Sequence, residues 1–177
     1  ALDLGVDGVA VTTMANLGFH RLMEERGVRV VVTDVGDRYV LEALRREELL
    51  LGGEQSGHLI WLDGHVTGDG LVAGLLLCRA LGGRSVSDAV AVMPRFPQAI
   101  ENLPRTRRGP LPDELVAAVD DVNAELDGAG RVLVRPSGTE PVVRVLAEAE
   151  TASLPSAARA GIQRPPAEKH SPSASWK

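Results

Sequence analysis

Residues 6–33, VDGVAVTTMANLGFHRLMEERGVRVVVT, decide the fold class of this 177-residue chain. The two ends of this stretch, 6–12 and 28–33, are short, apolar and rich in β-branched residues, which predicts two buried strands. Between them Asn16 can cap a helix that runs to about Glu25. A strand, a helix and a second strand with short connections predict an α/β layer with a parallel sheet.

The same pattern continues towards the middle of the chain. It predicts a helix over 39–46, a glycine-rich turn at 52–53, a strand over 58–62 and an almost wholly apolar helix that starts at Thr67 or Asp69 and ends near Leu81. Cys78 lies inside that apolar helix, so we expect its thiol to be buried and inert. We assign residues 1–90 to a first domain of the parallel α/β type.

A second, smaller domain is expected over residues 91–150, because glycines and prolines interrupt the pattern between 82 and 112. Beyond them the sequence predicts a strand near 98–103, a helix over 113–126, and strands over 131–135 and 142–148. This order is typical of a small α+β unit.

Residues 151–177 have a different composition. Nine of these 27 residues are Ser or Pro and no apolar periodicity is left, which predicts a disordered tail unrelated to the chemistry. Both lysines of the chain, Lys169 and Lys177, lie in this tail, so a foreign or frame-shifted origin for it is a second interpretation.

Composition excludes several classes of protein. The net charge of −5 argues against a general nucleic-acid binder, which needs a basic surface. No lysine precedes residue 151, so that part of the chain holds neither a Walker-type phosphate loop nor a Schiff-base lysine. Apolar runs are too short for a membrane span, and a single cysteine forms no internal disulfide. We therefore expect a cytoplasmic protein without membrane partners.

The loop over 52–58, GGEQSGH, is the first candidate site. Its glycines let the backbone turn sharply and let a ligand approach closely. Glu54 can accept hydrogen bonds from two neighbouring hydroxyls, and Ser56 adds a smaller donor and acceptor beside His58. This grouping suits a sugar or another polyol. The alternative is a polar hairpin with structural hydrogen bonds only.

The loop over 135–141, RPSGTEP, is the second candidate site. An arginine fork, hydroxyl groups and exposed backbone amides together favour an anion such as phosphate. The residues concerned are Arg135, Ser137, Gly138 and Thr139, with Arg144 able to add charge from the following strand. The alternative is a β-turn capped by an arginine.

A third turn, DVGDR over 34–38, places paired charges between a strand and a helix. Either it contacts a ligand, or Asp37 caps the helix and Arg38 lies in solvent.

These three segments, taken in order, resemble the C-terminal half of the α-D-phosphohexomutases. TDVGDRYV over 33–40, GGEQSGH over 52–58 and RPSGTEP over 135–141 carry the resemblance, which covers about residues 6–150. Their form is most similar to the bacterial phosphoglucosamine mutase branch of that family.

The resemblance implies an activity. That branch interconverts glucosamine 6-phosphate and glucosamine 1-phosphate, with four domains around one cleft, a phosphoserine donor, Mg²⁺ and glucosamine 1,6-bisphosphate as intermediate. It implies that Glu54 and Ser56 hold sugar hydroxyls, and it makes His58 the candidate proton relay. It implies phosphate binding by the loop that contains Arg135, Ser137, Gly138 and Thr139, and it places Gly36, Asp37 and Arg38 along the cleft.

The chain also departs from the family. The phosphoserine loop and the aspartate-rich metal loop of the family occur nowhere in the sequence, so we expect no catalytic nucleophile and no metal ligands here. The chain is therefore expected to be most of a third domain and a fourth domain without its closing helix. Its partners would be a sugar phosphate and the missing N-terminal domains, and alone it would be inactive. A non-catalytic sugar-phosphate-binding module and a degenerate relic are the alternatives.

Overall fold

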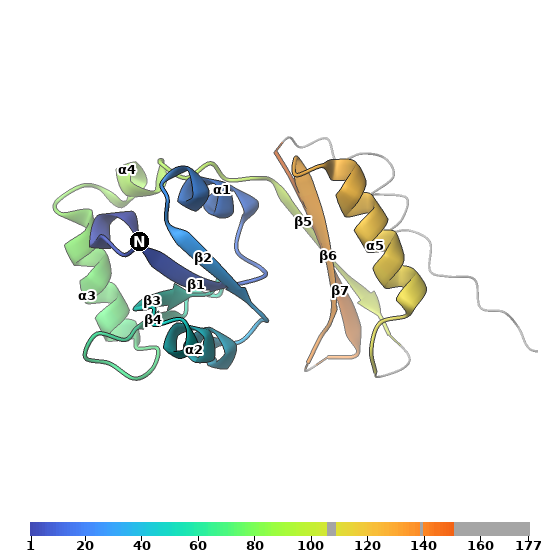
Figure 1. Cartoon of the computed structure of the whole chain (residues 1–177), viewed down its shortest axis with the longest axis horizontal. Coiled ribbons are helices and arrows are strands. Elements are labelled where there is room, and N and C mark those ends of the chain that lie inside the picture. Colours follow the sequence, from blue (N-terminus) through green and yellow to red (C-terminus); the bar gives the residue numbers. More distant parts are fainter. Residues whose placement is uncertain (106–108, 139, 151–177) are drawn as a thin grey trace, which may run out of the picture. The chain divides into compact units, whose positions relative to one another are not determined.

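The computed structural model describes residues 1–105, 109–138 and 140–150. The chain divides into two units, Ala1–Phe96 and Pro97–Lys177 (Figure 1). The division lies six residues beyond the expected domain boundary at 90/91. The reason is that Phe96 is buried in the first unit, only 5% exposed. The tail over 151–177, which we expected to be disordered, lies outside the described residues.

The first unit contains a four-stranded sheet in the order β2-β1-β3-β4. β1 (Gly8–Thr12) pairs in parallel with both β2 (Arg29–Thr33) and β3 (Leu51–Gly53), and β4 (Leu59–Trp61) pairs antiparallel with β3. The expected parallel α/β layer is confirmed, with one antiparallel edge strand added by a hairpin.

Helices lie between and after these strands. A short 3-10 helix, η1 (Leu2–Leu4), precedes β1, and α1 (Leu17–Glu25), α2 (Asp37–Arg46), α3 (Gly70–Leu81) and α4 (Val86–Val90) follow. Asn16 caps α1 as the sequence predicts, and of the two predicted starts of α3, Thr67 and Asp69, it is Asp69 that caps the helix. α2 begins two residues before the expected helix over 39–46, and neither η1 nor α4 was expected.

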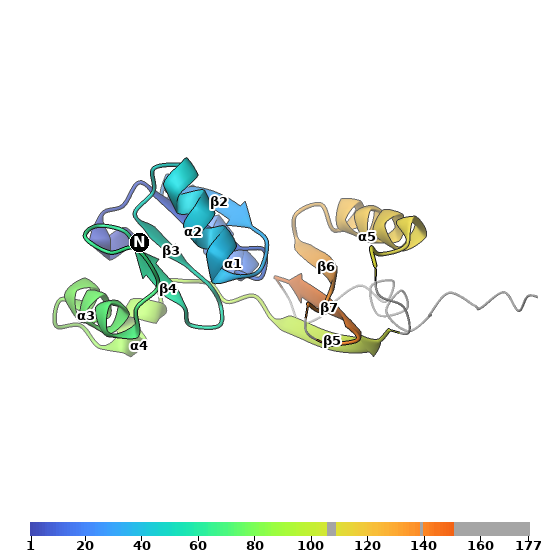
Figure 2. The same ribbon diagram turned by 90° about the horizontal axis from the view of Figure 1, so that it is seen from below.

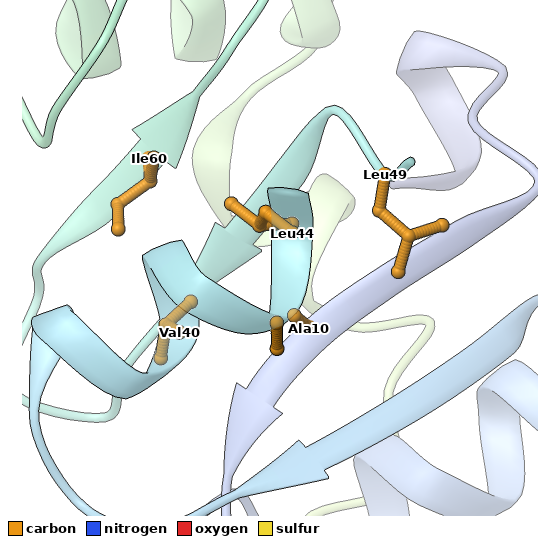
Figure 3. Packing of buried hydrophobic residues seen from close by; sticks show 6 residues of the cluster. Ala10, Val40, Leu44, Leu49 and Ile60 are labelled. Carbon is orange, nitrogen blue, oxygen red and sulfur yellow. The ribbon is translucent and has the colours of Figure 1, made fainter. Parts of the chain in front are cut away.

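The core lies on both faces of the sheet. Val40 and Leu44 of α2 pack against Ala10 of β1 and Ile60 of β4 (Figure 3). Val9, Val11 and Leu51 form a second cluster on the other face, together with partly buried residues of η1 and α1. α2 and α3 lie on opposite sides of the sheet (Figure 2).

Gly52 corrects one expectation, because it lies in β3 and not in a turn. A Cβ atom at Gly52 would lie 2.6 Å from Val40 Cγ1 and 3.0 Å from Leu44 Cδ1. The missing side chain therefore lets α2 pack closely on the sheet, which the local sequence pattern does not reveal.

Cys78 corrects another expectation, because it is exposed rather than buried in the core. Apart from Arg79, α3 consists of apolar residues and glycines, but it is the side carrying Leu76, 9% exposed, that packs in the unit. Cys78 lies two residues further along, on a different side of the helix, where solvent reaches it.

The cap of α3 makes the helix start sensitive to acid. Asp69 Oδ1 accepts hydrogen bonds from the backbone amides of Val72 (3.0 Å) and Leu71 (2.8 Å), and these bonds lower the pKa of Asp69. A carboxyl group whose pKa is lower in the folded state than in the unfolded state stabilises the folded state at pH values above its unfolded pKa. This stabilisation is lost as the pH falls through the pKa of the folded state. We expect an NMR titration to give Asp69 a midpoint below the ordinary range of an aspartate, with the Leu71 and Val72 amide shifts following it. Asp69→Asn should remove that shared transition, and a normal midpoint would contradict the cap.

The second unit is a three-stranded antiparallel sheet with one helix. β7 (Val142–Ala149) lies between β5 (Gln98–Pro104) and β6 (Gly130–Pro136), and α5 (Asp113–Leu126) precedes β6. The core between the helix and the sheet contains Leu126, Val132, Val145 and Ala147. The expected small α+β unit is confirmed.

The other face of this sheet holds a buried carboxylate. Glu148 of β7 is fully buried, and its two oxygens accept from Arg131 Nε at 2.9 Å and from Gln98 Nε2 at 3.0 Å. The strands on both sides of β7 therefore donate hydrogen bonds to one buried carboxylate, and Arg131 supplies the opposite charge.

Candidate functional site

The first candidate loop is the β3–β4 hairpin. The Glu54 amide donates to the His58 carbonyl at 2.9 Å, and the Gly57 amide donates to the Glu54 carbonyl at 3.1 Å. Gly57 has φ +96°, a left-handed conformation that a side chain would strain. The backbone of this loop is thus the polar hairpin that the sequence offered as the alternative, and a binding role depends on the side chains of the hairpin.

The hairpin gathers three of its four polar side chains, those of Glu54, Ser56 and His58, at one point. Ser56 Oγ lies 3.2 Å from Glu54 Oε2 and 2.9 Å from His58 Nδ1, and the two latter atoms are 3.7 Å apart. In a nucleophilic triad the imidazole stands between the serine and the carboxylate, each on a different ring nitrogen. Here both approach Nδ1, so this cluster suits the binding of hydroxyl groups and not activation of Ser56.

Glu54 is held by a second loop. The Gly36 amide donates to Glu54 Oε1 at 2.8 Å, and the Glu54 side chain is only 11% exposed. Gly36 is the N-cap of α2 with φ +137°, which explains the glycine at this position. Since β2 and β3 both run parallel to β1, their carboxyl ends lie at one edge of the sheet, where ligands of open α/β folds bind.

Asp37 and Arg38 interact with residues that are close to them in the sequence. Asp37 Oδ1 accepts from the Arg38 amide at 2.8 Å, while Arg38 Nε pairs with Glu42 Oε1 at 2.9 Å. The Arg38 guanidinium also lies 5.5 Å from the centre of the Tyr39 ring, and its side chain is exposed. Of the three residues expected to line a cleft, Gly36 is therefore the one bonded to the sugar-binding candidates, through a bond that sequence reasoning missed.

The second candidate loop joins β6 and β7. The Ser137 amide donates to the Val142 carbonyl at 2.9 Å, and Ser137 Oγ accepts from the Glu140 amide at 3.3 Å. Among the described residues, no atom beyond the chain neighbours of Gly138 lies within 4 Å of the position that a Cβ there would take, so the described structure leaves space for a ligand at Gly138. Thr139 lies outside the described residues.

Two arginines stand beside this loop. Arg135 and Arg144 are opposite each other in the antiparallel register of β6 and β7. The Nε atoms of both are buried and have no hydrogen-bond partner among the described residues. Arg144 Nη2 pairs with Glu140 Oε2 at 2.8 Å. Burial, and then the charge of Arg144, lower the pKa of Arg135, as expected where two cations share a partly buried site.

A metal ion is not accommodated by the side chains seen here. Among the described residues, no group of three or more His, Cys, Asp or Glu is placed to hold one. Nor does any helix in that part of the chain have the length and apolar character to cross a membrane.

Comparison with known proteins identifies the family to which the two units are similar. Residues 2–96 match the family model "Phosphoglucomutase/phosphomannomutase, alpha/beta/alpha domain III", and residues 97–159 match "Phosphoglucomutase/phosphomannomutase, C-terminal domain". The second match extends nine residues into the tail that we expected to be unrelated to the family.

Curated relatives are longer than this chain. The phosphoglucosamine mutase of Bacillus subtilis is 46% identical over 152 residues, which cover 84% of this chain and 34% of that protein. The phosphoglucosamine mutase of Frankia alni is 51% identical over 154 residues, with the same coverages. The chain thus spans about one third of the length of these relatives.

Solved structures agree on the fold. Aspergillus fumigatus N-acetylphosphoglucosamine mutase, in complex with GlcNAc-6P and magnesium, matches with a TM-score of 0.71 at 20% identity, over 88% of this chain and 37% of that one. A family protein of Burkholderia thailandensis matches with a TM-score of 0.63 at 23% identity, over 82% of this chain and 34% of that one. Together with the two domain matches, these findings show that the chain belongs to the phosphoglucomutase/phosphomannomutase family.

Proposed function

We propose that this chain is the C-terminal part of a phosphoglucosamine mutase, in which its two loops bind glucosamine 6-phosphate and glucosamine 1-phosphate. The observation that carries the proposal is the pair of guanidinium groups on Arg135 and Arg144, whose buried Nε atoms have no partner in the described part of the chain. A phosphate group would bring further negative charge to the two guanidinium groups and accept hydrogen bonds from their Nε atoms.

Each loop has its own role in this proposal. Glu54 and Ser56 accept hydrogen bonds from sugar hydroxyls, and His58, which is 64% exposed, is the candidate to exchange a proton there. Arg135 and Arg144 bind the phosphate that is not reacting, together with Ser137, Gly138 and Thr139. A bisphosphate that reorients during the reaction presents either end to this loop, so the loop needs to recognise phosphate and not the ring.

The reacting groups lie elsewhere in this proposal. Magnesium neutralises charge that develops on a transferred phosphoryl group, but the described residues include no cluster that fits it. We therefore assign the magnesium ligands and the phosphoserine to the remaining two thirds of a longer protein.

Arg135→Gln tests the phosphate site. We expect the substitution to weaken binding of glucosamine 6-phosphate, and of inorganic phosphate, by about 10- to 100-fold, because a charge-assisted hydrogen bond is lost. Isothermal titration calorimetry on the 177-residue chain measures this. Arg45→Gln, which changes an exposed arginine on α2, is the control and should leave both affinities unchanged. Equal affinities for the Arg135→Gln and wild-type chains would refute the assignment.

Glu54→Gln tests the sugar site separately. The amide oxygen of glutamine can still accept from the Gly36 amide, so the hairpin should remain folded. We expect weaker binding of glucosamine 6-phosphate and unchanged binding of inorganic phosphate. A loss of affinity for both ligands would mean that Glu54 supports the structure and does not recognise the sugar.

A non-catalytic binding module is the second candidate, because both candidate loops are present in this chain. An activity assay separates the two functions. The mutase proposal expects no conversion of glucosamine 6-phosphate by this chain alone, and conversion when the missing domains are added. No conversion with those domains present, but retained affinity for the ligand, would favour the binding module.

A further inference from the structure

An ion pair between Arg144 and Glu140 lies at the proposed phosphate site. Arg144 Nη2 and Glu140 Oε2 are 2.8 Å apart. Arg144 is opposite Arg135 in the register of β6 and β7, and these two arginines are the groups to which we assign phosphate binding. A carboxylate of the loop therefore already contacts one of the two guanidinium groups that a phosphate would use.

The backbone of the loop holds Glu140 at this place. Its amide donates to Ser137 Oγ at 3.3 Å, and its carbonyl accepts from the Val142 amide at 2.9 Å. Both backbone groups of Glu140 are thus bonded within the turn, while its side chain reaches Arg144 four residues further along the chain. Because these backbone bonds do not involve the carboxylate, it can leave Arg144 without unfolding the turn.

A second arginine–glutamate pair in the same sheet provides a comparison. Arg131 and Glu148 are 2.9 Å apart, and their side chains are 17% and 0% exposed. The side chains of Arg144 and Glu140 are 37% and 56% exposed. Water can replace either partner of an exposed ion pair at little cost, whereas a buried charge cannot lose its partner in this way. The contact of Glu140 is therefore one that a ligand can displace.

The charge of Glu140 also opposes a bound phosphate. Arg135, Arg144 and Glu140 together carry a formal charge of +1, whereas the two arginines alone carry +2. A phosphate monoester carries a charge of about −1.5 to −2 at pH 7. The carboxylate thus weakens phosphate binding in two ways, because it occupies Arg144 and because it repels a like charge.

We propose that the Glu140 carboxylate is an internal competitor for the phosphate site, which contacts Arg144 in the free protein and leaves it when a phosphate binds. The inference rests on the function proposed above. A bisphosphate that reorients has to release one phosphate before it presents the other. A carboxylate that takes the place of the departing phosphate on Arg144 promotes this release, so Glu140 acts through Arg144 and not on the ligand itself.

Glu140→Gln tests the competition, with inorganic phosphate as the probe. The amide is neutral and similar in size to the carboxylate, so the loop should keep its fold. We expect isothermal titration calorimetry on the 177-residue chain to show phosphate binding about 10-fold tighter than in the wild-type chain. Glu125→Gln is the matched control, because it removes the same charge from the exposed surface of α5, and it should change the affinity by less than about 2-fold.

The same substitution in an Arg144→Gln background tests whether the competition is for Arg144. The carboxylate then has no Arg144 guanidinium to occupy, so we expect Glu140→Gln to increase phosphate affinity by less than about 2-fold. An undiminished increase would show that Glu140 acts by general charge repulsion, and it would overturn the proposal. In the wild-type chain, the ¹³C resonance of the Glu140 carboxyl group should shift as phosphate saturates the site.

The remaining outcomes separate this inference from the function on which it rests. If the wild-type chain binds phosphate and the Glu140→Gln chain binds it equally or more weakly, the competition is refuted and the phosphate site stands. If neither chain binds phosphate, the phosphate site itself is refuted, and the inference with it.

Discussion

Replacement of Glu148 by alanine is expected to lower the free energy of unfolding of the second unit by about 3–5 kcal/mol, the range for breaking a buried ion pair. Glu148 is fully buried, and Arg131 is only 17% exposed at its side chain. The substitution leaves the Arg131 guanidinium and the Gln98 amide without the carboxylate that each now contacts. Native-state hydrogen exchange of the β6 and β7 amides measures the effect in this unit alone.

A matched set of variants separates charge from volume. Glu125→Ala, on the exposed surface of α5, should change the same amides by less than about 0.5 kcal/mol. The double variant Arg131→Met with Glu148→Leu removes both charges and should recover most of the loss, since apolar residues often replace a buried ion pair at little cost. A double variant as unstable as Glu148→Ala would show that packing, and not an uncompensated charge, causes the loss.

The sequence predicted what depends on short-range patterns. Runs of β-branched residues predicted every strand except β3, and the caps at Asn16 and Asp69 predicted the starts of α1 and α3. β3 was missed because Gly52 and Gly53 resemble a turn, whereas a side chain at Gly52 would make contacts that are too close with Val40 and Leu44 of α2. Those contacts arise only once the chain has folded.

The features of the candidate site also divide into those that the local sequence predicts and those that depend on the folded structure. Glu54, Ser56 and His58 come together because one hairpin contains them, so local sequence suffices. The bond from the Gly36 amide to Glu54 joins residues 18 positions apart and requires the parallel pairing of β1 with both β2 and β3. The burial of the Arg135 Nε atom likewise depends on the packing of its sheet and not on the RPSGTEP motif itself.

The Gly18→Ala substitution is expected to have the second large effect, on the first unit. An alanine Cβ at Gly18 would overlap the carbonyl oxygen of Pro94 and lie 2.8 Å from its carbonyl carbon. The segment that ends at Phe96 is held there by Asn16, whose Nδ2 donates to the Phe96 carbonyl and whose Oδ1 accepts from the Phe96 amide, both at 3.0 Å. The overlap would displace this segment and expose Phe96.

We expect the Gly18→Ala chain to lose about 3 kcal/mol of unfolding free energy in the first unit, from steric strain and the loss of two buried hydrogen bonds. Gly74→Ala is the matched control, because it also adds one methyl group to a glycine within a helix but meets no atom within 4 Å. It should stabilise the unit by about 0.5–1 kcal/mol, the helix propensity gained on replacing glycine. Urea unfolding followed at amides of β1 compares the two variants. Changes of opposite sign in the free energy of unfolding would show that the position of the added methyl group decides the result. Equal stabilisation by the two substitutions would mean that Pro94 does not pack on α1.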